Sequence, residues 1–139
     1  MKIYTIRLHP NQDLRQELQK FAALNNIQAG FILTCVGALK CMNLRMAGTT
    51  TKNQIFKKFE EDFEIVSLVG TITANDCHLH VAGSNKDGIT IGGHLKEHTR
   101  IGVTAEIVIG EDEKFIYQRI IDNETGFEEL EIKKRELDF

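Results

Sequence analysis

Residues 77–95 read CHLHVAGSNKDGITIGGHL, and this stretch decides the fold. Before the turn-forming residues SNKDG, the side chains alternate between polar and apolar, a pattern typical of a strand. The segment ITIGGHL after them predicts a second strand, so the two form an antiparallel hairpin. Successive side chains of a strand point to opposite faces, which places His78 and His80 on the same face. The stretch therefore predicts a sheet with paired imidazoles on one surface.

The length of the turn decides whether a third histidine joins this pair. A three-residue turn at 86–88, with its glycine in the left-handed conformation, places His80 opposite His94. A five-residue turn at 84–88 places His78 opposite His94 instead. Either odd turn gathers three imidazoles on one face, whereas a two-residue turn would send His94 to the other face.

Three imidazoles on one face form a candidate metal site of His78, His80 and His94. Three neutral imidazoles leave one tetrahedral position open for water or substrate, as in catalytic zinc sites. Zinc is the first expectation, and iron, copper and nickel also suit imidazole. Gly92 and Gly93 permit a bulge, or the close approach of another backbone or a ligand. The alternative is a set of half-exposed histidines on a polar sheet face.

Outside the hairpin, the chain predicts one main helix and more strands. Residues 2–9 predict a strand that ends at Pro10, and the apolar residues between 14 and 22 recur at helical spacing. We expect Asn11 to cap this helix and Asp13 to lie in its first turn. Further strands are expected at residues 29–46, 56–61, 64–73, 100–110 and 114–122.

One helix against many strands predicts an α+β fold: a central, mostly antiparallel sheet flanked by one main helix. A parallel, doubly wound sheet would need several more crossover helices. The 139 residues suffice for a single domain, with a core at about residues 1–122. An acidic strand and tail are expected at 123–139.

The composition excludes several classes of protein. The chain has 17 Lys and Arg against 20 Asp and Glu, a net charge of −3, and it shows no basic stripe that would bind DNA phosphates. No apolar run approaches the ~20 residues that span a bilayer, so no membrane partner is expected. The N-terminal residues lack a secretory signal, and a cytoplasmic protein is expected. The three cysteines Cys35, Cys41 and Cys77 lack CxxC spacing and predict buried free thiols.

Two charged residues within predicted strands are further candidates for a site. Glu106 lies in an apolar strand, where a carboxylate is costly unless it is paired or liganded. It could support a metal-bound histidine or act as a general base, or it could pair with Arg7 or with another subunit. Arg7 could bind an anionic ligand, although a structural ion pair is the commoner role. His9 and His98 are expected at the surface.

The ordered motifs VGAL, SLVGTIT, HLHVAGSNKDG, IGGHL and TAEIVI belong to a pattern that runs from about residue 7 to about residue 109, most of the chain. This succession resembles the plants-and-prokaryotes conserved (PPC) domain family, which also carries a DNA-binding label. The resemblance implies a homotrimer with an antiparallel sheet and a helix, and a metal at His78, His80 and His94 near a subunit boundary. Plant members carry AT-hook segments, and this chain has no Arg-Gly-Arg-Pro element, so their DNA function is not carried over.

Three functions follow from these features, in order of preference. The first is a trimeric binding module, in which a metal or small ligand serves a regulatory role. The second is a DNA-associated protein, which the family label suggests and the charge disfavours. The third is a metal-dependent enzyme, in which metal-activated water attacks a small substrate with the help of Glu106.

Overall fold

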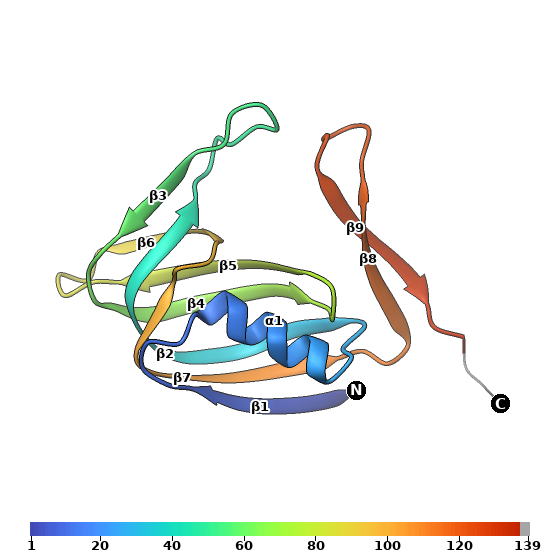
Figure 1. The fold of residues 1–139 in the computed structure, drawn as a ribbon, viewed down its shortest axis with the longest axis horizontal. Coiled ribbons are helices and arrows are strands. Elements are labelled where there is room, and N and C mark those ends of the chain that lie inside the picture. Colours follow the sequence, from blue (N-terminus) through green and yellow to red (C-terminus); the bar gives the residue numbers. More distant parts are fainter. Residues whose placement is uncertain (137–139) are drawn as a thin grey trace.

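The structure, a computed structural model, describes residues 1–136. Within these residues there are one α-helix and nine strands (Figure 1). The helix α1 is Leu14–Leu24. The strands are β1 (Lys2–Leu8), β2 (Gly30–Arg45), β3 (Phe56–Phe59), β4 (Phe63–Ile72), β5 (Cys77–Ser84), β6 (Thr90–Leu95), β7 (Arg100–Glu111), β8 (Phe115–Ile121) and β9 (Glu128–Lys134).

The first seven strands form one sheet in the order β1-β7-β2-β4-β5-β6, and β3 pairs with β2. Each pairing in this sheet is antiparallel, which confirms the predicted α+β class. The long strand β2 has irregular register against β7 at three points, which bends it. Its last residues therefore also reach β6, where Leu44 lies opposite Leu95 and Arg45 opposite His94. This extra pairing brings the far edge of the sheet back to its centre.

Helix α1 packs its apolar stripe of Leu14, Leu18 and Ala22 into the core. Its cap differs from the predicted one, because Asp13 rather than Asn11 accepts the hydrogen bond from the Gln16 backbone N–H, at 3.0 Å. Asn11 has a φ of 72° and forms the turn after β1. Asparagine tolerates this left-handed conformation, so a residue suited to capping serves the turn instead.

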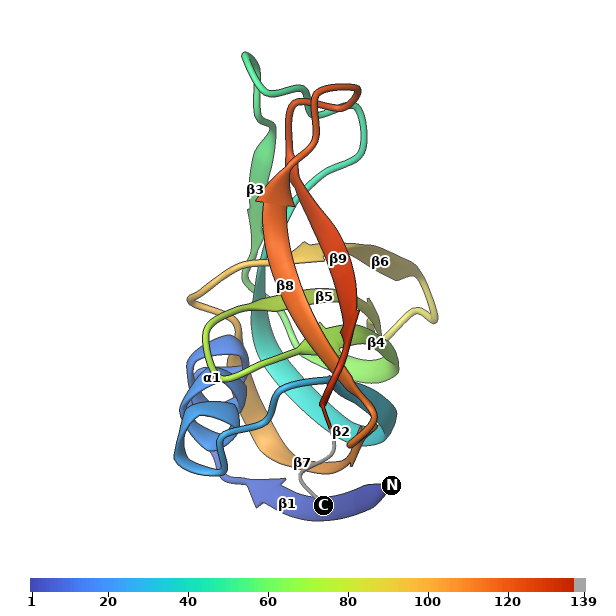
Figure 2. The same cartoon turned by 90° about the vertical axis from the view of Figure 1, so that its right-hand side faces the viewer.

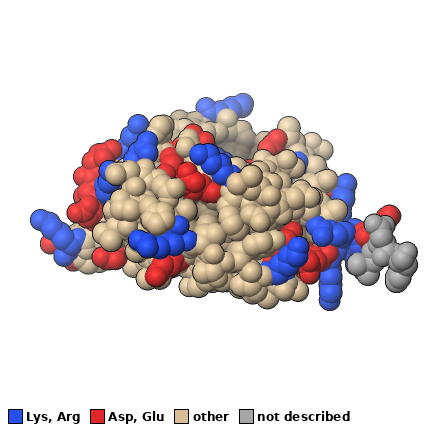
Figure 3. Space-filling model, turned by 60° about the horizontal axis from the view of Figure 1, so that its bottom comes forward, with Lys and Arg blue, Asp and Glu red and all other residues tan. Residues whose placement is uncertain are grey.

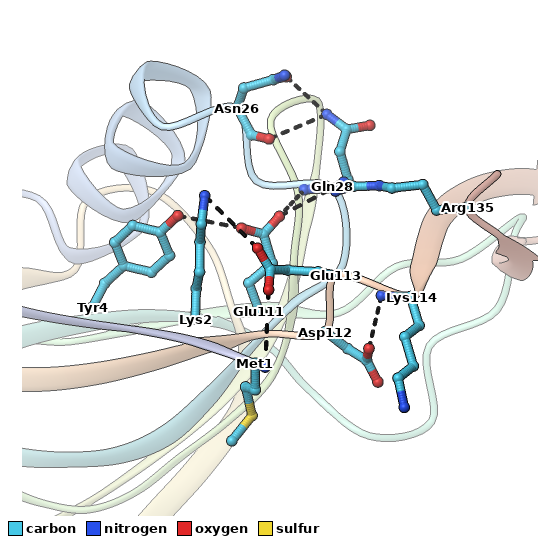
Figure 4. A network of polar contacts seen from close by, with 10 residues as sticks. All are labelled: Met1, Lys2, Tyr4, Asn26, Gln28, Glu111, Asp112, Glu113, Lys114 and Arg135. Carbon is cyan, nitrogen blue, oxygen red and sulfur yellow. Dashed lines mark hydrogen bonds and ion pairs between the residues drawn. The ribbon is translucent and has the colours of Figure 1, made fainter. Parts of the chain in front are cut away.

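The strands β8 and β9 form a separate two-stranded hairpin beside the main sheet (Figures 1 and 2). The segment expected to supply an edge strand thus pairs only with β8, and residues 137–139 of the expected tail lie outside the described part. At the base of the hairpin, the buried Glu111 accepts hydrogen bonds from the Tyr4 hydroxyl and the Gln28 backbone N–H, and Arg135 lies 4.0 Å away (Figure 4). Further along the hairpin, Arg119 pairs with Asp76 at 3.0 Å. Ion pairs at two points along its length therefore hold the hairpin against the main sheet.

The predicted free thiols are confirmed. Cys41 and Cys77 are buried, Cys35 is half-buried, and none of them forms a disulfide. Burial raises the pKa of the Cys35 thiol to about 11. No helix among residues 1–136 has both the length and the apolar composition needed to cross a membrane.

The fully buried Leu44 joins three strands, because it lies opposite Lys57 on β3 and Leu95 on β6. We expect Leu44→Ala to lower the free energy of unfolding by about 2–5 kcal/mol, since it leaves a cavity at this junction. Urea denaturation followed by circular dichroism measures the change. Ile89→Ala, in the exposed β5–β6 turn, is the control and should cost less than about 1 kcal/mol. Equal losses in the two variants would contradict this account of the core.

Candidate metal centre

The β5–β6 turn has the three-residue form that brings the histidines together. The Asn85 backbone N–H donates to the Ile89 carbonyl, and the Gly88 N–H donates to the Asn85 carbonyl, both at 2.9 Å. Gly88 takes the left-handed conformation with a φ of 76°. His80 is consequently opposite His94, as the three-residue turn predicts. The Asn85 side chain accepts two further backbone N–H groups of the turn, which holds this conformation.

The three imidazoles of His78, His80 and His94 form one cluster. One ring nitrogen from each lies within 4.8 Å of the others. The ring centroids are 5.2 Å apart for His78 and His80, 5.0 Å for His78 and His94, and 5.6 Å for His80 and His94. His80 is exposed, and the other two are half-buried. The predicted convergence of the rings is therefore present in the structure.

The cluster fits a transition-metal ion. With Zn–N distances of ~2.0–2.1 Å, nitrogens around tetrahedral zinc lie ~3.3 Å apart, so small ring rotations would close the present spacing. Imidazole nitrogen is a preferred ligand of zinc and of several other divalent transition metals. His78, His80 and His94 can therefore hold such an ion with one position left for another ligand.

The surroundings keep two of the rings neutral. Burial, together with the adjacent Arg45 guanidinium and the His78 ring, lowers the pKa of His94 to about 3. Burial also lowers the pKa of His78, followed by the charge of Arg119. At neutral pH both rings thus carry a free nitrogen lone pair, which metal binding requires.

Arg45 comes from the end of β2, and its Nη2 atom lies 3.4 Å from His94 Nδ1. A guanidinium has only donors, so Nδ1 of His94 is the acceptor in this contact. The proton of the neutral His94 ring is then on Nε2. The Arg45 guanidinium also lies over the Phe127 ring in the β8–β9 turn, 5.5 Å from its centroid.

The glycines near the cluster allow strands to approach closely. A Cβ atom on Gly93 would lie 2.9 Å from the Arg45 carbonyl oxygen, so the absence of a side chain permits the β2–β6 pairing. A Cβ atom on Gly92 would meet the Ala82 Cβ at 2.9 Å. The close approach expected at Gly92 and Gly93 is thus made by neighbouring strands. As candidate ligand residues they remain a prediction.

The structure does not bring Glu106 or Arg7 to the histidines. Glu106 is exposed on β7, opposite Arg7 on β1 and Val36 on β2. Val36 is nine residues along β2 from Arg45, the residue opposite His94. Within one chain, Glu106 is therefore not placed to support a histidine of the cluster or to act as a base there, and its role as a candidate site residue stays a prediction. Its solvent exposure removes the cost of burial, and the Arg7 side chain donates instead to Thr104 Oγ1 at 3.1 Å.

A cavity of about 550 Å³ lies next to the cluster, between the sheet and the β8–β9 hairpin. Its lining includes His78 and His94, four basic residues (Arg15, Arg45, Lys96 and Arg119) and three acidic residues (Asp76, Glu128 and Glu129). The sequence analysis missed this group of cations. Only Lys96 could have been identified from the sequence. It lies two residues after His94, and side chains two residues apart in a strand point to the same face. The others come from distant segments that only the fold brings together.

These features define a class of protein: a small α+β domain with a three-histidine cluster on an antiparallel hairpin. The Plants and Prokaryotes Conserved (PCC) domain matches residues 1–113, and the chain belongs to this family. Its three clustered histidines all lie within the matched residues.

Among curated proteins, the chain is 40% identical over 134 residues to the bifunctional protein GlmU of Synechococcus sp. strain JA-3-3Ab. The match covers 96% of this chain and 21% of that relative, so the chain spans about a fifth of its length.

Solved structures share the whole fold. A hypothetical protein from Salmonella enterica is 33% identical with a TM-score of 0.91, covering 96% of this chain and 94% of that one. A protein from Archaeoglobus fulgidus described as metal-containing is 27% identical with a TM-score of 0.77, covering 94% and 93%. A "putative DNA binding protein" from Bacteroides thetaiotaomicron is 26% identical with a TM-score of 0.82, covering 93% and 91%.

Gly70 tests how the fold positions the histidines. It lies on β4 opposite Leu79, between His78 and His80, with a φ of 142°, and a Cβ atom there would collide with the His78 carbonyl. We expect Gly70→Ala to cost on the order of 3 kcal/mol, because backbone strain and collision add. Urea denaturation measures the loss. Gly88→Ala is the control, since its φ is also positive but no atom lies within 4 Å of the added Cβ, and it should cost about 1 kcal/mol. A smaller loss in the free energy of unfolding for Gly70→Ala than for Gly88→Ala would contradict the close approach of β4 and β5 at Gly70.

Proposed function

We propose that this protein is a metal-binding regulatory module in which His78, His80 and His94 hold one divalent transition-metal ion, with zinc as the first expectation. The observation that carries the proposal is the meeting of three ring nitrogens within 4.8 Å. The metal-containing relative from Archaeoglobus fulgidus supports it. The large buried core of the domain is built without metal ligands, so the ion would serve function rather than folding.

A binding role is favoured over the metal-dependent enzyme weighed as the alternative. A bound ion would supply Lewis-acid chemistry, and the histidines would hold and orient it. The enzyme expected from the sequence needs Glu106 as its assisting group, and within one chain that carboxylate lies away from the cluster. The binding role needs only the residues that the fold brings together. The activity of the bifunctional GlmU relatives is not assigned to this chain, which spans a fifth of their length.

Metal content tests the proposal directly. We expect protein purified without chelators and then dialysed against zinc to retain about one ion per chain, measured by inductively coupled plasma mass spectrometry. His80→Ala removes one of three ligands from an exposed position, so it should lower the retained metal at least tenfold without unfolding the chain. His9→Ala removes a histidine that is exposed at the end of β1 and should retain the wild-type amount. Equal metal in wild-type and His80→Ala protein would exclude the site.

We also propose that the chain forms the homotrimer that its family resemblance implies. Apolar side chains are exposed on three neighbouring strands: Val36 on β2, Val66 and Val69 on β4, and Val103 on β7. Their exposed fractions reach 59% at Val36 and 68% at Val103. Contact with further copies of the chain would remove this surface from water.

Light scattering coupled to size exclusion tests the assembly. The wild-type protein should have three times the 15.8 kDa mass of one chain. Val36→Asp and Val103→Asp should each shift the mass toward the monomer, because a carboxylate buried at an interface is costly. Ile89→Asp, an equally exposed site in the β5–β6 turn, serves as the control. A wild-type protein that stays monomeric as its concentration rises would contradict the trimer.

DNA is not proposed as a partner. On the face shown in Figure 3, basic and acidic side chains are interspersed and form no continuous basic surface. The net charge of −3 likewise gives no excess of cations for phosphate contacts. The DNA-binding description therefore stays with the relatives, and the cytoplasmic location stays a prediction from the sequence.

A further inference from the structure

The cavity beside the histidines has walls from both parts of the molecule. The main sheet contributes His78 and His94, and the hairpin contributes Arg119 on β8 and Phe127 in its turn. Arg119 also donates to Thr71 Oγ1 at 2.8 Å, so the hairpin is fixed close to the strand that faces His78. At about 550 Å³, the cavity has the size of small-molecule sites rather than of a macromolecular interface.

Two cations in this cavity have no acidic partner in the described residues. Arg15 pairs with Glu97 at 3.6 Å and Arg119 pairs with Asp76 at 3.0 Å, so both are largely compensated. In contrast, no carboxylate among residues 1–136 lies within ion-pair distance of Arg45 or Lys96.

Both of these side chains are half-buried, and each rests against an aromatic ring. The Lys96 ammonium lies 5.9 Å from the Phe56 ring centroid, and the Arg45 guanidinium lies 5.5 Å from that of Phe127. Aromatic faces attract cations without neutralising them. Partly desolvated cations of this kind are stabilised by an anionic partner.

A metal at the cluster would increase the need for an anion. Three neutral imidazoles leave the double positive charge of the ion uncompensated, and Arg45 adds another positive charge next to His94.

Metal binding would also free the Arg45 guanidinium. If the ion takes Nδ1 of His94, the lone pair that Arg45 now uses is lost. If it takes Nε2, the ring proton moves to Nδ1, which then cannot accept. In both cases Arg45 loses its acceptor and becomes available to a ligand.

We propose that this cavity binds a small oxyanion, a carboxylate or phosphate group of a small molecule, through Arg45 and Lys96. The guanidinium offers paired donors suited to the two oxygens of such a group, and the ammonium adds a point charge. The inference deepens the proposed function, on which it rests in one respect: a metal at the histidines strengthens the binding of the anion.

Isothermal titration calorimetry with inorganic phosphate tests the site at constant ionic strength. Chelator-treated protein is titrated first, so that phosphate cannot bind through free metal. Arg45→Gln and Lys96→Gln should each weaken binding about tenfold or more, since each removes a charge-assisted hydrogen bond. Arg45→Lys keeps the charge and should retain part of the affinity. Lys86→Gln, in the exposed β5–β6 turn, removes the same charge elsewhere and should bind like the wild type.

The outcomes separate this inference from the proposed function. Wild-type affinity in both Arg45→Gln and Lys96→Gln, in folded proteins by circular dichroism, would overturn the anion site whatever the metal content. An equal loss in Lys86→Gln would also overturn it, because the effect would then be one of general charge. A wild-type protein that retains no zinc but loses phosphate binding in these variants would refute the metal centre and leave the anion site standing. Tighter phosphate binding by zinc-loaded protein than by chelator-treated protein would support both.

Discussion

The chemistry of this molecule depends on the register between β5 and β6. Two backbone hydrogen bonds at 2.9 Å, between Asn85 and Ile89 and between Gly88 and Asn85, fix that register at the turn. A slip of one residue would turn His94 to the opposite face of the sheet and leave a pair of histidines in place of three. The meeting of the three histidines therefore depends on Gly88, whose left-handed conformation gives the turn three residues rather than two.

The register also places the histidines where two different environments meet. Partial burial of the His94 and His78 rings lowers the pKa of each and keeps both neutral. They also border a cavity in which Arg45 and Lys96 have no carboxylate of residues 1–136 within ion-pair distance, and these two cations disfavour a further positive charge beside the rings. Neutral imidazoles do not compensate the charge of a metal ion, and the nearby Arg45 and Lys96 repel that charge. An anion bound in the cavity would offset this repulsion. The same residues thus explain why a metal and an acidic ligand would be taken up together.

The β5–β6 hairpin could be predicted from local sequence, whereas the contacts between segments far apart in the chain could not. Strand alternation and the turn residues predict the hairpin, because both act over a few neighbouring positions. The position of Glu106 away from the histidines could not be predicted, since an apolar strand pattern does not reveal which strand lies beside it or whether its polar face meets solvent. Arg45 was missed for the same reason: its partner His94 is 49 residues away along the chain. Asp13 takes the capping role expected of Asn11 because both residue types suit caps and turns, and only the path of the chain after β1 decides between them.

The two walls of the cavity come from segments on either side of the end of the family match. The family match ends at residue 113, so it contains the three histidines together with Arg45 and Lys96. The hairpin that supplies Arg119 and Phe127 follows that boundary, and it is attached through Glu111 and Asp76 of the main body. The histidines, Arg45 and Lys96 therefore lie within the family match, while Arg119 and Phe127 lie in the C-terminal segment that follows it. If the proposed anion binds, the residues within the family match would supply the charge that holds it, and the hairpin would limit the size and shape of the ligand that fits.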